Sequence, residues 1–246
     1  MDFVPAAMDR ARGVASSAWA GKTAAAIGPR PLPSAAAYAE GGEGRAAVVD
    51  QGTSHVSVLD AQGNAVAVTT SINTILGSKR RSESTGILWN DSMDDFSLPV
   101  AINAFGFPPS EENFIEPKKR PMSSMVPTVV YDNATGDVRL VVGASGGSRI
   151  ISATASVLLR VLLFNESVKD AVDRPRLHNQ WLPGHTSYEE GFPKEFLNAL
   201  RARGQTLLSY RGGYLGAAQA IVRDYDGVIY STSDRRRGST SIAAGY

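Results

Sequence analysis

The segment from residue 137 to residue 162 constrains the fold more than any other part of the sequence. A strand pattern over 137–143 runs into a glycine turn, Gly143-Ala144-Ser145-Gly146-Gly147-Ser148. A broad apolar helical face follows, formed by Ile150, Ile151, Ala153, Val157, Leu158, Val161 and Leu162. Arg149 and Arg160 exclude this helix as a membrane span. A helix with one apolar face must bury it, so the segment predicts helices packed on a sheet.

Two hairpins supply much of that sheet. The first is expected at 54–60 and 64–72, where Val56, Val58, Val66 and Val68 place β-branched side chains at alternating positions. The second is expected at 126–131 and 137–143. Helices are predicted at 1–25, 166–173 and 194–203, and strands at 205–210, 217–223 and 227–232. This order of elements predicts an α/β or α+β architecture.

Composition narrows the function classes. The chain has 246 residues, of which 43% are hydrophobic and 20% charged, and a net charge of +1, which argues against a dedicated nucleic-acid binder. It has no Cys, which excludes disulfides, thiolate zinc sites and a Cys nucleophile. No apolar run reaches the roughly 18 to 20 residues that span a bilayer, and no signal-peptide apolar run is visible. The sequence predicts no compartment.

Two segments have the composition of loops. Residues 28–52 are rich in Pro, Gly and Ala and read as a linker that ends directly before Thr53. Residues 73–125 hold few periodic runs, and Gly and Pro residues interrupt them, among them Gly77, Gly86, Pro99, Pro108, Pro109, Pro117 and Pro121. A loop-rich stretch this long inside a compact domain is usually functional or disordered. Its polar residues Asn73, Asp94, Asp95, Ser123 and Ser124 could hold a small zwitterion.

Thr53, at the head of the first strand, is a candidate nucleophile that needs a base. His55 lies two residues away and would share its strand face, so a Thr–His–Asp triad is conceivable, although no Gly-x-Ser-x-Gly motif accompanies it. A cut between Gly52 and Thr53 is the alternative, because the new α-amino group, with a pKa of about 7.7 to 8.0, is a well-matched base.

Gly146 and Gly147 admit two interpretations. They could present successive N–H groups at a helix N-terminus as an oxyanion hole, or they could simply make a tight strand-to-helix turn. His178 and His185 have no third ligand at suitable spacing, so no metal site is predicted.

Taken in order, the motifs resemble the small subunit of γ-glutamyltranspeptidase (glutathione hydrolase), an N-terminal-nucleophile (Ntn) hydrolase. The resemblance covers essentially all of 53–246. It rests on the following motifs: Gly52 to Ser57; Asp60 to Asn73; Ser84 to Asn90 with Met93 to Ser97; Lys119 to Met125; Gly143 to Ile150; Pro175-Arg176 with His178, Gln180-Trp181 and Pro183; and Ala244-Gly245-Tyr246. The implied fold is α+β, the small-subunit half of a four-layer αββα sandwich.

The resemblance also implies roles. Thr53 would attack a γ-glutamyl carbonyl, as in glutathione, to form an ester, and water, an amino acid or a dipeptide would accept the glutamyl group. Autocleavage would occur between Gly52 and Thr53. Asn73 and Asp95 would hold the substrate's α-amino end, and Ser123 and Ser124 its α-carboxylate. Gly146 and Gly147 would form the oxyanion hole. No metal or cofactor is implied.

The sequence departs from the family pattern at several points. Ser71 stands where the family generally has a second Thr, and Ser92 where homologues often carry Glu or Gln. Residues 1–52 resemble the last helix and the linker of the family's large subunit, and no residue here matches the carboxylate-binding Arg of that subunit. A large subunit is therefore an expected partner for the domain at 53–246.

Three functional classes remain open. One is the catalytic half of a γ-glutamyl hydrolase and transferase. The second is a non-catalytic relative with the light chain only, or a truncated gene product. The third is a Thr/His/Asp hydrolase of unrelated fold.

Overall fold

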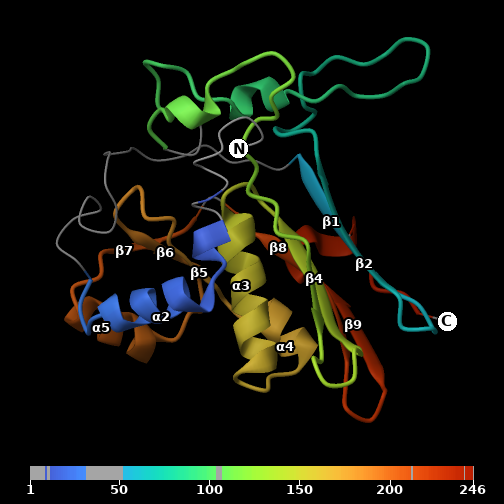
Figure 1. Ribbon diagram of the computed structural model, residues 1–246, viewed down its shortest axis with the longest axis vertical. Coiled ribbons are helices and arrows are strands. Elements are labelled where there is room, and N and C mark those ends of the chain that lie inside the picture. The colour runs from blue at the N-terminus through green and yellow to red at the C-terminus, as the bar shows by residue number, and fades with distance from the viewer. Residues whose placement is uncertain are drawn as a thin grey trace.

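The computed structural model describes residues 9, 12–31, 52–103, 107–211, 213–240 and 242–245 (Figure 1). Its central element is a four-stranded antiparallel sheet in the order β3-β4-β8-β9. The strands are β3 (Thr128–Tyr131), β4 (Val138–Ser145), β8 (Ala217–Arg223) and β9 (Ile229–Ser233). Strand β4 is buried on both faces along most of its length, which places it between two covering layers.

Two helices cover one face of this sheet, α3 (Arg149–Leu162) and α4 (Val168–Asp173) (Figure 1). Because side chains alternate along a strand, Leu140, Val142 and Ala144 of β4 all face the helices. Ile150, Ala153 and Val157 of α3 meet them, and each is at most 2% exposed. Full burial of an Ile or Val side chain contributes about 1.5–3 kcal/mol, so this layer anchors the helix that follows the glycine turn.

A two-stranded sheet covers the other face. It consists of β1 (Thr53–Leu59) and β2 (Ala65–Ser71), which pair antiparallel from Leu59↔Ala65 at the turn to Thr53↔Ser71 at the open end. The Asp60 carboxylate sets the turn by accepting the backbone N–H groups of Gln62 and Asn64 at 2.9 and 2.8 Å. Thr53 and His55 face inward onto the central sheet.

The layers therefore follow the order helix, sheet, sheet. These are three layers of the expected αββα sandwich, and the α+β class predicted from the sequence is confirmed. In the described part of the chain, no helix is long and apolar enough to cross a membrane.

A small three-stranded sheet lies beside the sandwich in the order β5-β6-β7. Its strands are β5 (Leu177–His178), β6 (Thr186–Tyr188) and β7 (Leu207–Ser209), and β6 pairs parallel with β7 across helix α5 (Lys194–Ala202). The sequence predicted α5 and β7. It missed β5 and β6 because runs of two and three residues are too short to show alternation.

The other predicted elements agree with the structure or lie partly outside it. The helix expected at 1–25 appears as α2 (Ser17–Ala26), which has no buried residue, while residues 1–8, 10 and 11 lie outside the described residues. Most of the expected linker, residues 32–51, also lies outside them, so the division of the chain at residue 53 stays a prediction. The loop-rich segment contains the short 3-10 helices η2 (Ser92–Asp95) and η3 (Glu111–Asn113) and lies at one end of the sandwich (Figure 1).

Candidate active site

The Thr53 hydroxyl is buried at the open end of the β1–β2 pair. Its residue is 2% exposed, and Oγ1 lies 2.8 Å from the Oγ of Ser71, directly opposite in the strand register. Cross-strand neighbours in an antiparallel pair have closely spaced side chains, so register alone brings the two hydroxyls together. Ser71 Oγ also accepts the backbone N–H of Asn73 at 2.9 Å, which fixes its position.

Gly52 is enclosed by the chain that follows β2. Its N–H donates to the Asn73 carbonyl at 3.1 Å, and its own carbonyl accepts the Ile72 N–H at 2.9 Å. A Cβ at this position would overlap the carbonyl oxygens of Asn73 and Thr74. Glycine thus lets the chain after β2 pack closely against residue 52, while the Ile72 N–H holds the peptide carbonyl before Thr53.

A cavity of about 150 Å³ opens beside Thr53, and it brings together most of the site predicted from the sequence. Its lining includes seven of the eight predicted residues: Thr53, Ser71, Asn73, Asp95, Ser123, Ser124 and Gly147. These residues come from β1, β2 and the chain directly after it, η2, the chain at 121–125 and the turn before α3. Ser92 also lines the cavity. The proximity is what the predicted roles require, while the contacts with substrate stay a prediction.

Two residues that the sequence did not single out hold the cavity wall together. Asn113, 7% exposed, donates its Nδ2 to the Asp95 carbonyl at 2.8 Å, and its Oδ1 accepts the Met122 N–H at 3.0 Å. It therefore links the segment that carries Asp95 to the one that carries Ser123. Asp91 accepts the Thr74 N–H at 3.0 Å and ties down the chain after Asn73. No spacing signal reveals either residue, because both act through the folded loop.

The glycine turn places one of its two residues at the cavity. Gly146 and Gly147 both have positive φ, 123° and 61°, which explains the need for glycine. Gly147 lines the cavity, whereas Gly146 packs against Gly216, whose Cα would lie 3.0 Å from a Cβ at 146. Among the described residues, neither N–H donates to a protein acceptor. The turn therefore presents the Gly147 backbone at the cavity that Thr53 also lines.

Arg237 connects the C-terminal part of the chain to the nucleophile. It lies in η4 (Arg235–Thr240), and its Nη2 donates to the carbonyl of Thr53 and, at 2.8 Å, to Ser145 Oγ at the end of β4. Nothing in the sequence alone distinguishes it within the Arg235-Arg236-Arg237 triplet.

Its neighbours form a buried ionic cluster that holds η4. The Arg176–Asp234 pair, at 2.8 Å, is fully buried, and Arg236 pairs with Glu189 at 2.6 Å and with Asp234 at 3.0 Å. Burial alone raises the pKa of Asp234, but Arg176 and Arg236 outweigh it, so the pKa is lowered and the carboxylate stays charged.

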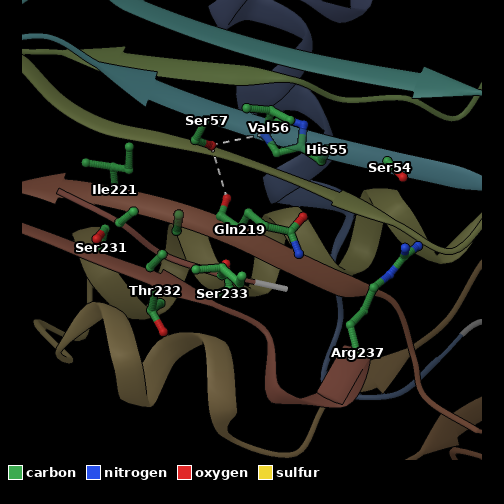
Figure 2. A pocket seen from close by; sticks show the side chains of 14 residues that line it. Ser54, His55, Val56, Ser57, Gln219, Ile221, Ser231, Thr232, Ser233 and Arg237 are labelled. Carbon is green, nitrogen blue, oxygen red and sulfur yellow. Dashed lines mark hydrogen bonds between the residues drawn. The ribbon is translucent and has the colours of Figure 1, made fainter. Parts of the chain in front are cut away.

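His55 is not arranged as a base for Thr53. Its Nδ1 lies 2.8 Å from Thr69 Oγ1 and its Nε2 lies 3.1 Å from Ser57 Oγ, which donates to the Gln219 carbonyl (Figure 2). Both ring nitrogens are thus engaged by hydroxyls other than that of Thr53, and the ring packs on Gly143, where a Cβ would overlap it. Burial lowers the pKa of His55 to about 4. This geometry removes the base that a Thr–His–Asp triad requires.

His178 and His185 line a separate cavity of about 220 Å³ with Arg149 and Tyr210. In the part of the chain that the structure describes, no group of three or more His, Cys, Asp or Glu residues could hold a metal ion.

Comparison with known proteins decides the family. The family model for gamma-glutamyltranspeptidase matches residues 1–244. The chain belongs to the gamma-glutamyltranspeptidase family. The resemblance identified from the motifs is thereby confirmed.

Three relatives show how much of a family member the chain represents. Glutathione hydrolase proenzyme 1 of Schizosaccharomyces pombe is 40% identical over 198 residues, which are 80% of this chain and 31% of that protein. Scoloptoxin SSD20 of Scolopendra dehaani is 44% identical over 76% of this chain and 94% of its own length. A gamma-glutamyltranspeptidase T380A mutant from Helicobacter pylori has a TM-score of 0.68 and 40% identity, covering 74% of this chain and 98% of that one. The chain thus spans about a third of the length of the Schizosaccharomyces pombe glutathione hydrolase proenzyme.

Proposed function

We propose that this chain forms the catalytic half of a γ-glutamyl hydrolase and transferase, which acts on glutathione and related compounds through an ester on Thr53. The observation that carries the proposal is the single cavity that combines the Thr53–Ser71 hydroxyl pair, the Gly147 turn, and the polar set Asn73, Asp95, Ser123 and Ser124. A carboxylate and an amide suit an ammonium group, while two hydroxyls suit a carboxylate, so the lining complements a zwitterionic glutamyl end.

The first step is cleavage of the chain before Thr53. Thr53 Oγ1 attacks the Gly52 carbonyl carbon, and its proton leaves along the hydrogen bond to Ser71 and returns to the Thr53 nitrogen as the C–N bond breaks. The Ile72 N–H, 2.9 Å from the Gly52 oxygen, stabilises the charge that develops there. Water then hydrolyses the resulting ester, which leaves a Gly52 carboxylate and a free Thr53 amino group.

The second step is acyl transfer. The Thr53 amino group takes the proton of Oγ1, which attacks the γ-carbonyl of the substrate, and the Gly147 turn donates N–H groups to the oxyanion. The C–N bond of the substrate breaks, the departing amine takes the proton, and the glutamyl group remains as an ester on Thr53. Water or an amine then attacks this ester and regenerates the hydroxyl.

Intact mass of the purified 246-residue chain tests the first step. We expect a fragment that begins at Thr53 and runs to Tyr246, and its absence in Thr53→Ala. Thr70→Ala is the matched control, because Thr70 is an exposed threonine on β2. An uncut native wild type, or an equal cut in Thr53→Ala, would contradict the proposed nucleophile. Release of nitroaniline from a γ-glutamyl nitroanilide tests the second step.

A large subunit is part of the proposal. On their outward face, β1 and β2 expose Val56, Val58, Val66 and Val68, each 48–56% exposed. A two-stranded sheet is marginally stable alone, so an apolar outer face of this kind favours a covering partner. That partner would also supply the cation that binds the substrate carboxylate, since no residue of this sequence matches the family's carboxylate-binding Arg.

Co-expression with the large subunit of a family member tests this association. Val58 and Val66 are paired across the strands, so Val58→Lys with Val66→Lys is expected to abolish co-purification. Val228→Lys, at a 45% exposed valine in the β8–β9 hairpin, serves as the control. Co-purification that survives the paired lysines would rule out this face as the contact.

The alternative is a non-catalytic protein with the light chain only. The observation in its favour is that the matched region makes up 94% of Scoloptoxin SSD20, so this relative is little longer than the region that it shares with the chain. A chain that is cut at Thr53 but turns over no γ-glutamyl anilide, with or without a large subunit, would support this alternative.

A further inference from the structure

The side-chain amide of Gln180 is one of two groups that attach the segment at 178–182 to the start of α3. Gln180 Oε1 accepts the Ser148 hydroxyl at 2.6 Å and lies 2.9 Å from His178 Nε2. Gln180 Nε2 donates to the Leu182 carbonyl at 2.8 Å. Because a carbonyl can only accept, the nitrogen of the amide must face Leu182, which leaves the oxygen to face Ser148 and His178.

This orientation fixes the tautomer of His178. The Gln180 oxygen only accepts, so Nε2 carries a proton. In the neutral ring Nδ1 then accepts the single Ser152 hydroxyl proton at 2.7 Å, in preference to the Arg149 carbonyl, which lies 3.2 Å from the same oxygen. His178 is 8% exposed, and its burial lowers its pKa, so the ring is neutral at pH 7. Ser148 and Ser152 are four residues apart and share one face of α3. The segment therefore holds the first turn of the helix at two points.

The contact at Ser148 matters because Ser148 directly follows Gly147. It occupies the N-cap position of α3, yet its side chain makes no capping hydrogen bond and is bonded to Gln180 instead. On the other side of the glycine pair, Ser145 is bonded to Arg237. The two glycines have no side chains of their own, so the position of their N–H groups depends on these flanking anchors.

We propose that Gln180 and His178 are positioning residues that hold the Gly146–Gly147 turn at the distance from Thr53 that acyl transfer needs. The proposal rests on the proposed function for its catalytic consequence. The anchoring itself is a property of the folded chain and can be measured without turnover.

Two variants remove the anchor with little change of shape: Ser148→Ala deletes the donor, and Gln180→Met deletes the amide. We expect kcat for a γ-glutamyl anilide to fall about 10- to 100-fold, as small misplacements of catalytic groups do. KM should stay within about twofold, because Asp95, Ser123 and Ser124 lie on η2 and on the chain at 121–125, and not on the segments that carry Ser148 and Gln180. Ser156→Ala, in the same helix and outside the network, should match the wild type.

A second measurement uses amide hydrogen exchange of Ile150, whose N–H donates to the Gly147 carbonyl at 3.1 Å, followed by NMR in the wild type, Ser148→Ala and Ser156→Ala. Loss of one anchoring hydrogen bond should speed exchange about 10-fold in Ser148→Ala alone. The ¹⁵N shifts of His178 should show a protonated Nε2 and a bare Nδ1.

The outcomes separate the two proposals. A wild type that turns over no γ-glutamyl anilide under any condition refutes the proposed function, and the exchange rates then decide the anchoring. An active wild type with unchanged kcat in Ser148→Ala and Gln180→Met overturns the positioning role. An Ile150 exchange rate in Ser148→Ala equal to that of the wild type overturns it as well.

Discussion

Asn113→Leu should weaken both the fold and the binding of a glutamyl group. Leucine has the branching and nearly the shape of asparagine, so it fills the site and leaves no room for a replacing water. The substitution strands the Asp95 carbonyl and the Met122 N–H, which Asn113 satisfies at 2.8 and 3.0 Å. Each unsatisfied buried group costs about 1–3 kcal/mol, so the two together cost about 2–6 kcal/mol.

The added apolar surface of leucine offsets about 1–2 kcal/mol of that cost. We therefore expect a net loss of about 2 kcal/mol in the free energy of unfolding, or a midpoint lower by about 4–8 °C for a chain of this size. Binding should weaken as well, because Asn113 links the segment of Asp95 to that of Ser123.

Thermal unfolding followed by circular dichroism measures the first effect, and calorimetric titration with glutamate measures the second. Asn133→Leu is the matched control, since Asn133 is exposed in the turn between β3 and β4. A midpoint shift equal to that of the control, or a loss of stability without loss of glutamate affinity, would refute the reasoning that Asn113 holds the two binding segments together.

Three further predictions concern the layers around the site. Burial lowers the pKa of His55 in the folded state to about 4, so its contribution to stability is full above the unfolded pKa of 6.5 and is lost as the pH falls toward 4. Urea unfolding at the acidic end of this range should show up to about 3 kcal/mol less stability, and His55→Asn should abolish this loss. Asp234→Asn leaves the buried Arg176 charge without its carboxylate, so chemical denaturation should show a loss of about 3–5 kcal/mol, while the exposed Asp226→Asn should change little. Gly146→Ala meets a positive φ and the Gly216 backbone, so a cost of about 1–3 kcal/mol is expected in the same assay, whereas the exposed Gly184→Ala has open space for its Cβ and serves as the control.

The sequence predicted best where one periodicity decides the structure. The alternating valines placed the first hairpin at 54–60 and 64–72, within one residue of the observed Thr53–Leu59 and Ala65–Ser71. The apolar stripe after Gly147 predicted α3 in the same way. The apolar side chains of α3 are those that the central sheet buries, whereas the alternating valines lie on the outward face of β1 and β2.

The sequence predicted the site through its resemblance to family motifs rather than through the periodicity of apolar residues. Spacing shows that Thr53 begins a strand, but it does not show that Ser71 lies 2.8 Å away, since this depends on the register of the pair. Asn113 and Asp91 were missed because their contacts join segments through loop conformations that have no period. Arg237 was missed because its role arises only when η4 folds back against β1.

The hairpin turn at 60–64 has a consequence for the far end of β1. Side chains alternate with a period of two, so a one-residue insertion or deletion that shifts the pairing would exchange the faces of β1 relative to β2. Thr53 would then oppose Thr70 or Ile72 in place of Ser71, although the change lies six residues from Thr53 or more. Length variation is usually tolerated in a surface turn, but here the length of the turn decides which side chain lies opposite the buried Thr53 hydroxyl. The number of residues between Leu59 and Ala65 is therefore as much a property of the active site as the identity of the residue at position 53.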